Sequence, residues 1–204
     1  MTLEQMLTAA PVVPVLTIED EAQAVPLGRA LVAGGLPMLE VTLRTPAAIG
    51  AIRRIAAEVE GAIVGAGTVL NAKDLERVGE AGAKFAVSPG LPEGARPDGP
   101  VALLPGVATA TEVMAAIAAG FQFLKFFPAV PAGGLNMLKA FAPVFQQVRF
   151  CPTGGITVEN AAEFLALPNV VCVGGSWVAP GAALGAGDWG RITELARAAK
   201  LLRA

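Results

Sequence analysis

The sequence contains no histidine and no tyrosine among its 204 residues. Without an imidazole, a Ser-His-Asp triad, a histidine-ligated zinc site and a two-histidine iron site are excluded. Without a phenol, acid–base chemistry by tyrosine is excluded as well. Catalytic acids and bases must therefore come from carboxylates, lysine, arginine, cysteine, hydroxyl groups or bound water.

Charged residues are also scarce, at 16% of the chain, and their signs nearly balance. Fifteen Lys and Arg against seventeen Asp and Glu give a net charge of −2, which offers no basic stripe for nucleic acid. Apolar residues make up 54%, which excludes intrinsic disorder. No linker, low-complexity tract or charge run divides the chain, so we expect a single domain over residues 1–204.

Cysteine and targeting signals are equally sparse. Cys151 and Cys172 lie in apolar runs without CxxC spacing, which favours buried free thiols in a reducing cytosol; a disulfide is the alternative. The uncharged segment 164–187 is interrupted by prolines and glycines, so it is interpreted as a buried strand with loops and not as a membrane span. Residues 1–11 contain no Lys or Arg, unlike a secretory signal, and a cytoplasmic location without a membrane partner is expected.

Short apolar runs recur about every 20 to 25 residues, the spacing of strand–helix units. Eight such runs are predicted strands: 12–17, 38–43, 62–68, 84–88, 101–107, 123–128, 148–153 and 170–176. The intervening predicted helices are 21–33, 47–58, 72–81, 110–119, 134–141, 158–165 and 189–202, with N-caps expected at Asn71, Thr109 and Thr157.

This pattern predicts an α/β fold, a (β/α)₈ TIM barrel with a short extra N-terminal helix over residues 1–10. The segment 90–100 is rich in proline and glycine, so the fourth helix is expected to be reduced. An open doubly wound sheet is the alternative. Against it, the turn Gly65-Ala66-Gly67 lacks the third glycine and the acidic partner of a dinucleotide fingerprint.

Two predicted strands carry charged residues that an apolar strand should not contain. The first is the predicted strand 38–43. Polar side chains alternate there with apolar ones at Glu40, Thr42 and, one residue past the strand, Arg44, so these three are predicted to face the inside of the barrel. An internal ion pair without function is the alternative. In 123–128, Lys125 lies among large apolar side chains, where loss of hydration disfavours the charged amine and leaves a nucleophile for carbonyl carbon. A lysine whose head reaches water is the alternative.

Glycine pairs follow the last two predicted strands. They are Gly154-Gly155 and Gly174-Gly175, the second followed by Ser176. In barrels, the loops after strands seven and eight commonly bind phosphate through backbone N–H groups. Each pair alone is weak evidence because tight turns also need glycine, but two pairs at both expected positions indicate a phosphate site.

Six segments in order resemble the bacterial 2-keto-3-deoxy-6-phosphogluconate (KDPG) aldolases. They are LEVTLRT (39–45), GAGTVL (65–70), SPGL (88–91), KFFPA (125–129), RFCPTGGI (149–156) and GGSW (174–177). The likeness begins at PVVPVL (11–16) and extends to the C-terminal helix, although segment 90–100 is shorter than usual in the family.

The resemblance implies a class I, metal-independent lyase of the Entner–Doudoroff pathway, with no cofactor and a homotrimeric assembly. Lys125 would form the Schiff base, and Glu40 would shuttle protons. The residues implied to bind the phosphorylated keto-acid substrate are Arg44 and Thr68 for the carboxylate, near Pro89, then Thr153 for orientation, and Gly154, Gly155, Gly175 and Ser176 for the phosphate.

The implied reaction is cleavage of KDPG to pyruvate and glyceraldehyde 3-phosphate, and also of 4-hydroxy-2-oxoglutarate to pyruvate and glyoxylate. Related phosphogalactonate aldolases carry an apolar residue where Thr153 stands, which favours the gluconate substrate here. Two other readings remain: a phosphosugar isomerase or epimerase that uses Glu40 without covalent chemistry, and a catalytically silent barrel that serves as a binding module.

Overall fold

Parallel strands form the centre of the molecule, for which the computed structural model describes residues 1–203. The strands are β1 (Val12–Leu16), β2 (Met38–Thr42), β3 (Ile63–Gly67), β4 (Phe85–Val87), β5 (Ala102–Leu104), β6 (Gly106–Val107), β7 (Phe123–Phe126), β8 (Arg149–Pro152) and β9 (Val173–Gly175). They lie in one sheet of order β5-β4-β3-β2-β1-β9 and a second of order β6-β7-β8, and every described pairing is parallel.

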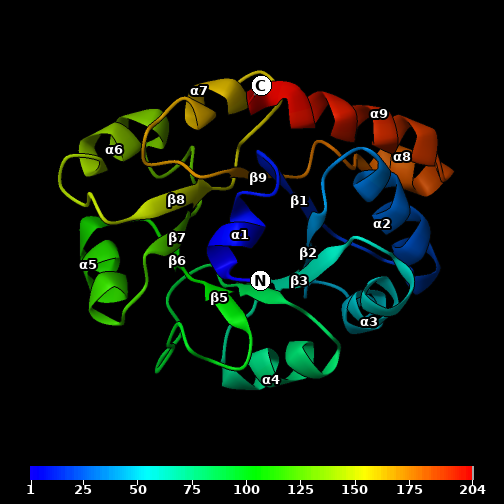
Figure 1. Ribbon diagram of the computed structural model, residues 1–204, viewed down its shortest axis with the longest axis horizontal. Coiled ribbons are helices and arrows are strands. Elements are labelled where there is room, and N and C mark those ends of the chain that lie inside the picture. Colours follow the sequence, from blue (N-terminus) through cyan, green and yellow to red (C-terminus); the bar gives the residue numbers. More distant parts are fainter. Residues whose placement is uncertain (204) are drawn as a thin grey trace.

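The two sheets meet at both of their edges. The predicted strand 101–107 is divided at Pro105 into β5 and β6, because proline has no N–H to donate to the ladder. At the other edge, isolated bridges join Phe150 to Val170 and Thr153 to Gly174, which link β8 to the β9 region. The strands therefore curl into the ring visible in Figure 1, a TIM-barrel-like α/β arrangement in place of an open doubly wound sheet.

Helices surround this ring (Figure 1). They are α1 (Leu3–Leu7), α2 (Ala24–Ala33), α3 (Ala48–Glu58), α4 (Ala72–Glu80), α5 (Ala110–Ala118), α6 (Gly134–Phe141), α7 (Ala161–Leu165), α8 (Gly181–Ala186) and α9 (Trp189–Lys200), with 3₁₀ turns η1 (Glu21–Gln23) and η2 (Leu201–Arg203). Between β4 and β5 the described chain forms turns and bends and no helix. Among the described helices, none is long and apolar enough to cross a membrane.

Local capping explains where several helices begin. The side chains of Asn71 and Thr109 accept hydrogen bonds at the starts of α4 and α5, as predicted. The predicted cap at Thr157 is wrong, because α7 begins only at Ala161. There the Asn160 side chain accepts from the backbone N–H of Thr157 and stabilises a turn before the helix.

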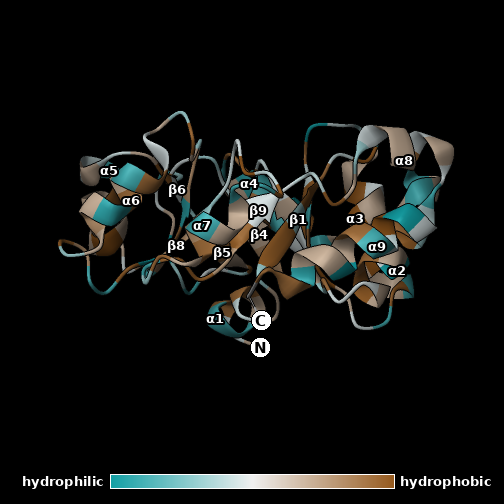
Figure 2. Cartoon of the chain, turned by 90° about the horizontal axis from the view of Figure 1, so that it is seen from above, coloured by the Kyte–Doolittle hydropathy of each residue, from teal (hydrophilic) through white to brown (hydrophobic). Residues whose placement is uncertain are grey.

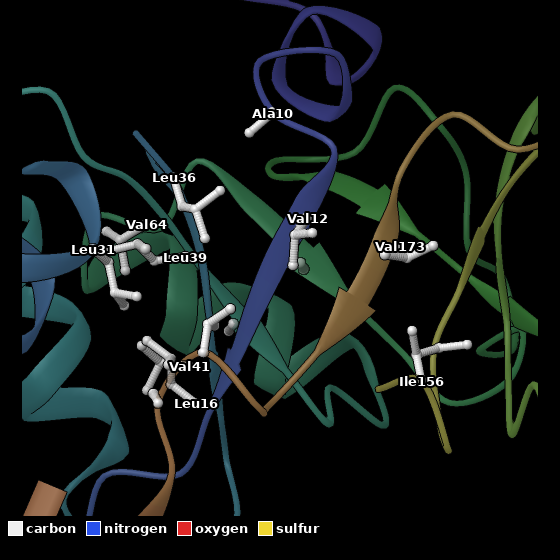
Figure 3. Close-up of a cluster of buried hydrophobic side chains, with 14 of the residues drawn as sticks. Ala10, Val12, Leu16, Leu31, Leu36, Leu39, Val41, Val64, Ile156 and Val173 are labelled. Carbon is white, nitrogen blue, oxygen red and sulfur yellow. The ribbon is translucent and has the colours of Figure 1, made fainter. Parts of the chain in front are cut away.

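The core has two layers because strand residues alternate between the two faces of the ring. The outer layer packs between strands and helices; in Figure 3 it includes Val12, Leu39, Val41, Val64 and Val173, with Leu31 and Leu36 beside them. The inner layer fills the lumen and comprises Val13, Met38, Phe85, Val87, Leu104, Cys151, Val171 and Cys172, together with Met6 and Leu7 of α1. Both cysteines are buried and are not joined in a disulfide, so the prediction of buried thiols in place of a disulfide is confirmed.

Helix α1 lies beyond one end of the strands (Figure 2). It leads directly into β1, and its Met6 and Leu7 pack against residues near the starts of the strands, such as Val13 and Met38. The apolar floor of the lumen therefore lies at the amino ends of the strands. Polar side chains that also point into the lumen lie further along the strands, toward their carboxyl ends, where barrels bind their ligands.

Candidate active site

Glu40 and Lys125 meet inside the barrel from two separate sheets. In β2, Met38 belongs to the lumen and Leu39 and Val41 to the outer layer, so alternation turns Glu40 inward. The same alternation turns Lys125 of β7 inward, between Leu124 and Phe126 of the outer layer. The Nζ of Lys125 donates to Oε1 of Glu40 at 3.2 Å, and the two residues are only 5% and 3% exposed.

The structure excludes one alternative left by the sequence, a lysine whose head reaches water. Lys125 does not extend to bulk water, and the ion pair of Glu40 is with Lys125 and not with Arg44. The amine contacts the Glu40 carboxylate in addition to its apolar neighbours, so a proton can pass directly between the two groups. The Nζ also lies 5.0 Å from the centre of the Phe127 ring, which contributes a cation–π contact.

Glycines on neighbouring strands make room for the buried side chains. A Cβ on Gly67 of β3 would overlap the Glu40 carboxylate. A Cβ on Gly174 of β9 would overlap the hydroxyl of Thr153. These close approaches fix the position of each polar side chain in the lumen, because the neighbouring strand leaves one space for it.

Arg44 and Thr68 lie together beyond the ends of β2 and β3. Arg44 is exposed in the turn after β2, one step past the predicted inward strand, and its Nε donates to the Thr68 hydroxyl at 3.2 Å. Thr68 has φ 60°, a left-handed conformation that is rare for a β-branched residue. Strain of this kind costs about 1–3 kcal/mol and clusters at ligand sites.

A cavity of about 230 Å³ opens beside the Lys125–Glu40 pair, since Phe127, which contacts the Lys125 amine, lines it. Its lining comes from the ends of β1, β7, β8 and β9 and the turn after β2: Val15, Thr17, Arg44, Phe127, Thr153, Gly154, Gly155, Ile156, Gly174, Gly175 and Ser176. The structure thus brings together Arg44, Thr153 and all four residues predicted to bind phosphate. Thr68 does not line this cavity, and Pro89 lines a different one with Val69, Leu70 and Ser88.

The glycine turn after β8 is anchored by hydrogen bonds from another segment of the chain. Gly154 and Gly155 have φ 100° and 78°, which L side chains rarely adopt. The N–H groups of Ala129 and Val130 donate to the carbonyls of Thr153 and Gly154 at 2.8 and 3.0 Å, so this turn is anchored to the segment after β7. A turn with its carbonyls used in this way leaves its own N–H groups free to approach an anion.

Sequence reasoning missed several residues of this cavity, among them Thr17 and Phe127. The sequence places Phe127 in the predicted apolar strand 123–128 and assigns it no role in binding. Thr17 gave a usable signal, because it is a hydroxyl residue at the end of the apolar run 12–17, where a barrel presents its ligand site.

The family model described as KDPG and KHG aldolase matches residues 3–195. The KHG/KDPG aldolase of Escherichia coli (strain K12) is 54% identical over 199 residues, covering 96% of this chain and 93% of its own. A crystal structure of KDPG aldolase from Legionella pneumophila, with pyruvate captured as a covalent carbinolamine intermediate, has a TM-score of 0.95 at 45% identity and covers 98% of each chain. The aldolase structure from Zymomonas mobilis ATCC 29191 has a TM-score of 0.94 at 52% identity, covering 100% of this chain and 98% of that one. This chain therefore belongs to the KDPG and KHG aldolase family.

Proposed function

We propose that this protein is a class I aldolase that cleaves KDPG, an intermediate of the Entner–Doudoroff pathway, to pyruvate and glyceraldehyde 3-phosphate. We propose the same chemistry on 4-hydroxy-2-oxoglutarate (KHG), which yields pyruvate and glyoxylate. The observation that carries the proposal is the buried contact between the Lys125 amine and the Glu40 carboxylate beside an open cavity. The covalent pyruvate captured in the Legionella pneumophila relative supports it.

In the proposed mechanism, Lys125 is the nucleophile. Its Nζ passes a proton to Glu40 and adds to the C2 ketone of the substrate, and one proton of the added amine moves to the C2 oxygen, which becomes a hydroxyl. Glu40 then protonates the departing C2 hydroxyl, which leaves as water, and a protonated imine remains on Lys125. The imine withdraws electrons from the neighbouring C3–C4 bond, and Glu40 is again a carboxylate.

Glu40 next acts as the general base. It removes the proton of the C4 hydroxyl, the C3–C4 bond breaks, and its electron pair moves toward the imine nitrogen. The aldehyde product leaves, and a pyruvate enamine remains on Lys125. Glu40 returns the proton to C3, and water hydrolyses the resulting imine to free pyruvate and the amine. One carboxylate thus serves each proton transfer, which its 3.2 Å approach to Nζ supports.

The rest of the cavity is proposed to hold the two charged ends of the substrate. The Arg44 guanidinium and the Thr68 hydroxyl are proposed to bind the carboxylate near Pro89, with Thr153 orienting the chain. The backbone at Gly154, Gly155 and Gly175, with the Ser176 hydroxyl, is proposed to bind the phosphate.

Borohydride trapping tests the proposal. After incubation with pyruvate and borohydride, the intact chain is expected to gain the mass of one reduced pyruvate, on the peptide that carries Lys125. The exposed Lys139 on α6 provides the control: Lys139→Ala should still be trapped, and Lys125→Ala should not. No mass gain in the parent chain would support an isomerase or a silent barrel instead, and a label on another lysine would contradict the role of Lys125.

Assembly and location are proposed from the family resemblance alone. We propose a cytoplasmic homotrimer of single-domain chains spanning residues 1–204, in which α1 covers the start of the barrel and turns replace a fourth helix. Analytical ultracentrifugation at several protein concentrations tests the assembly: a monomeric sedimentation coefficient at all of them would contradict it.

A further inference from the structure

The cavity contains one side-chain hydroxyl that the proposed mechanism does not use. Among its lining residues, the hydrogen-bonding side chains are those of Thr17, Arg44, Thr153 and Ser176. The last three already have proposed roles. Thr17 lies directly after β1, is exposed, and shares the cavity with both Arg44 and Ser176, the groups proposed for opposite ends of the substrate.

The hydrogen-bond direction at Thr17 is fixed by a buried neighbour. Thr42 of β2 is fully buried, and its hydroxyl donates to the backbone carbonyl of Leu16 at 3.0 Å. A hydroxyl carries one proton, so Thr42 has none left for Thr17. The contact of 3.3 Å between their Oγ1 atoms therefore has Thr17 as the donor and Thr42 as the acceptor.

While its hydroxyl donates to Thr42, Thr17 offers only lone pairs to the cavity. An acceptor of this kind does not bind phosphate or carboxylate, which are themselves acceptors at neutral pH. Its partner must be a donor, and between the two charged ends of the proposed substrate the donors are hydroxyl groups. The C4 hydroxyl gives its proton to Glu40, which leaves the hydroxyl on C5.

We propose that Thr17 is a specificity-determining residue that accepts a hydrogen bond from the C5 hydroxyl of the phosphorylated sugar acid. This inference rests on the proposed function and deepens it. KHG has a carboxylate carbon at C5 and no hydroxyl there, so it gains nothing from Thr17. The residue therefore favours the longer, phosphorylated substrate over the shorter one.

The test compares Thr17→Val, which keeps the size of the side chain, on both substrates. A lost hydrogen bond to a neutral group should lower kcat/KM for KDPG about tenfold. For KHG, kcat/KM should stay within about twofold of the parent value, and Thr17→Ser should restore most of the loss on KDPG. Thr111→Val, at an exposed threonine on α5 that does not line the cavity, is the matched control.

Two further outcomes separate this inference from the proposed function. Borohydride trapping of pyruvate should be intact in Thr17→Val, because pyruvate has no group at that position; loss of trapping would overturn the inference. An equal loss on both substrates, or no loss on KDPG, would overturn it as well. No trapping in the parent chain would instead contradict the aldolase itself.

Discussion

At the scale of single residues, a buried pair such as Lys125–Glu40 is weak evidence for stability, and the proposed chemistry gives a reason for its presence. A buried ion pair loses its hydration, and apolar residues of similar volume are often equally or more stable in its place by about 1–4 kcal/mol. The two residues are 85 positions apart in the chain and are 6% and 4% exposed at their side chains. Nothing about packing requires charges there, whereas an amine and a base in contact are what imine chemistry needs.

Replacing Glu40 by glutamine tests the division of labour within the pair. The amide keeps the size of the side chain and an acceptor oxygen for Nζ, but it cannot take up a proton. Turnover is expected to fall about 10²- to 10⁴-fold, the usual contribution of one general base. Trapping of pyruvate on Lys125, followed by mass spectrometry over hours, should persist at a lower rate. Unchanged turnover would show that the base is another group.

Gly67 is expected to be a positioning residue for that carboxylate. In Gly67→Ala, the new Cβ would occupy the space of the Glu40 carboxylate and push it from the Lys125 amine. Displacing a catalytic group by about 1 Å can cost 100-fold in rate, so kcat should fall by about that factor and KM should change less.

The control for Gly67→Ala is Gly185→Ala on α8, where a Cβ would meet open space. The rate at which pyruvate is trapped on Lys125 should also fall in Gly67→Ala, because the displaced carboxylate no longer contacts the amine. A variant that loses thermal stability but keeps the parent kcat and trapping rate would show that Gly67 has only a packing role.

These residues also show where sequence reasoning reached its limit. The alternation around Glu40 and the isolation of Lys125 among apolar residues predicted that both face inward, and they do. The distance between the two side chains could not be predicted from the sequence, because it depends on the curvature of the ring and on two strands that are not neighbours.

At the scale of elements, prediction was best where a signal is local. Asn71 and Thr109 are polar side chains before helical periodicity, and both cap their helices. Proline at 105 divides a predicted strand because of its own missing N–H. Helix α8 was not predicted, since Gly181–Ala186 is composed of glycine, alanine and one leucine and has no helical periodicity in its pattern. The position of this helix depends on contacts with the other segments that pack around it.

The cap of α5 gives a prediction for acid stability. Backbone N–H groups of Ala108 and Thr109, and the Thr109 hydroxyl, donate to the Glu112 carboxylate and hold its pKa below the ordinary value, with the Ala108 N–H as the largest cause. A group with a lowered folded pKa contributes stability above its unfolded pKa, and this stability is lost as pH falls through the folded pKa.

Glu112→Gln should therefore lower the free energy of unfolding at pH 7 by about 0.5 kcal/mol, a modest amount because the residue is exposed. Urea titrations at several pH values should show this difference closing below about pH 4. Glu76→Gln, at an exposed glutamate in the middle of α4, should leave the curve close to that of the parent. A difference that stays constant down to pH 3 would contradict a charge effect.

At the scale of the whole molecule, the two core layers cannot be separated along the chain. Each strand contributes alternate residues to the lumen and to the layer under the helices, as Met38 and Leu39 of β2 do. The lumen is filled by residues from α1, from strands as distant as β1 and β8, and from the segment just before β9, so the inner layer exists only when the ring is complete. Loss of packing in one layer should therefore unfold the other.

Phe85 and Phe150 allow this coupling to be measured. Both are fully buried, Phe85 in the lumen and Phe150 in the outer layer, and truncation of either to alanine should cost about 3–5 kcal/mol. In urea, tryptophan fluorescence from Trp177 and Trp189 and far-ultraviolet circular dichroism should give one shared midpoint for each variant, lower than the parent midpoint. Val144→Ala, at a side chain that is 67% exposed, should leave the midpoint unchanged. Two separate transitions in either phenylalanine variant would show that the chain unfolds as independent units. Coincident transitions are expected because the ring of strands is one cooperative structure, in which inner and outer contacts depend on the same backbone.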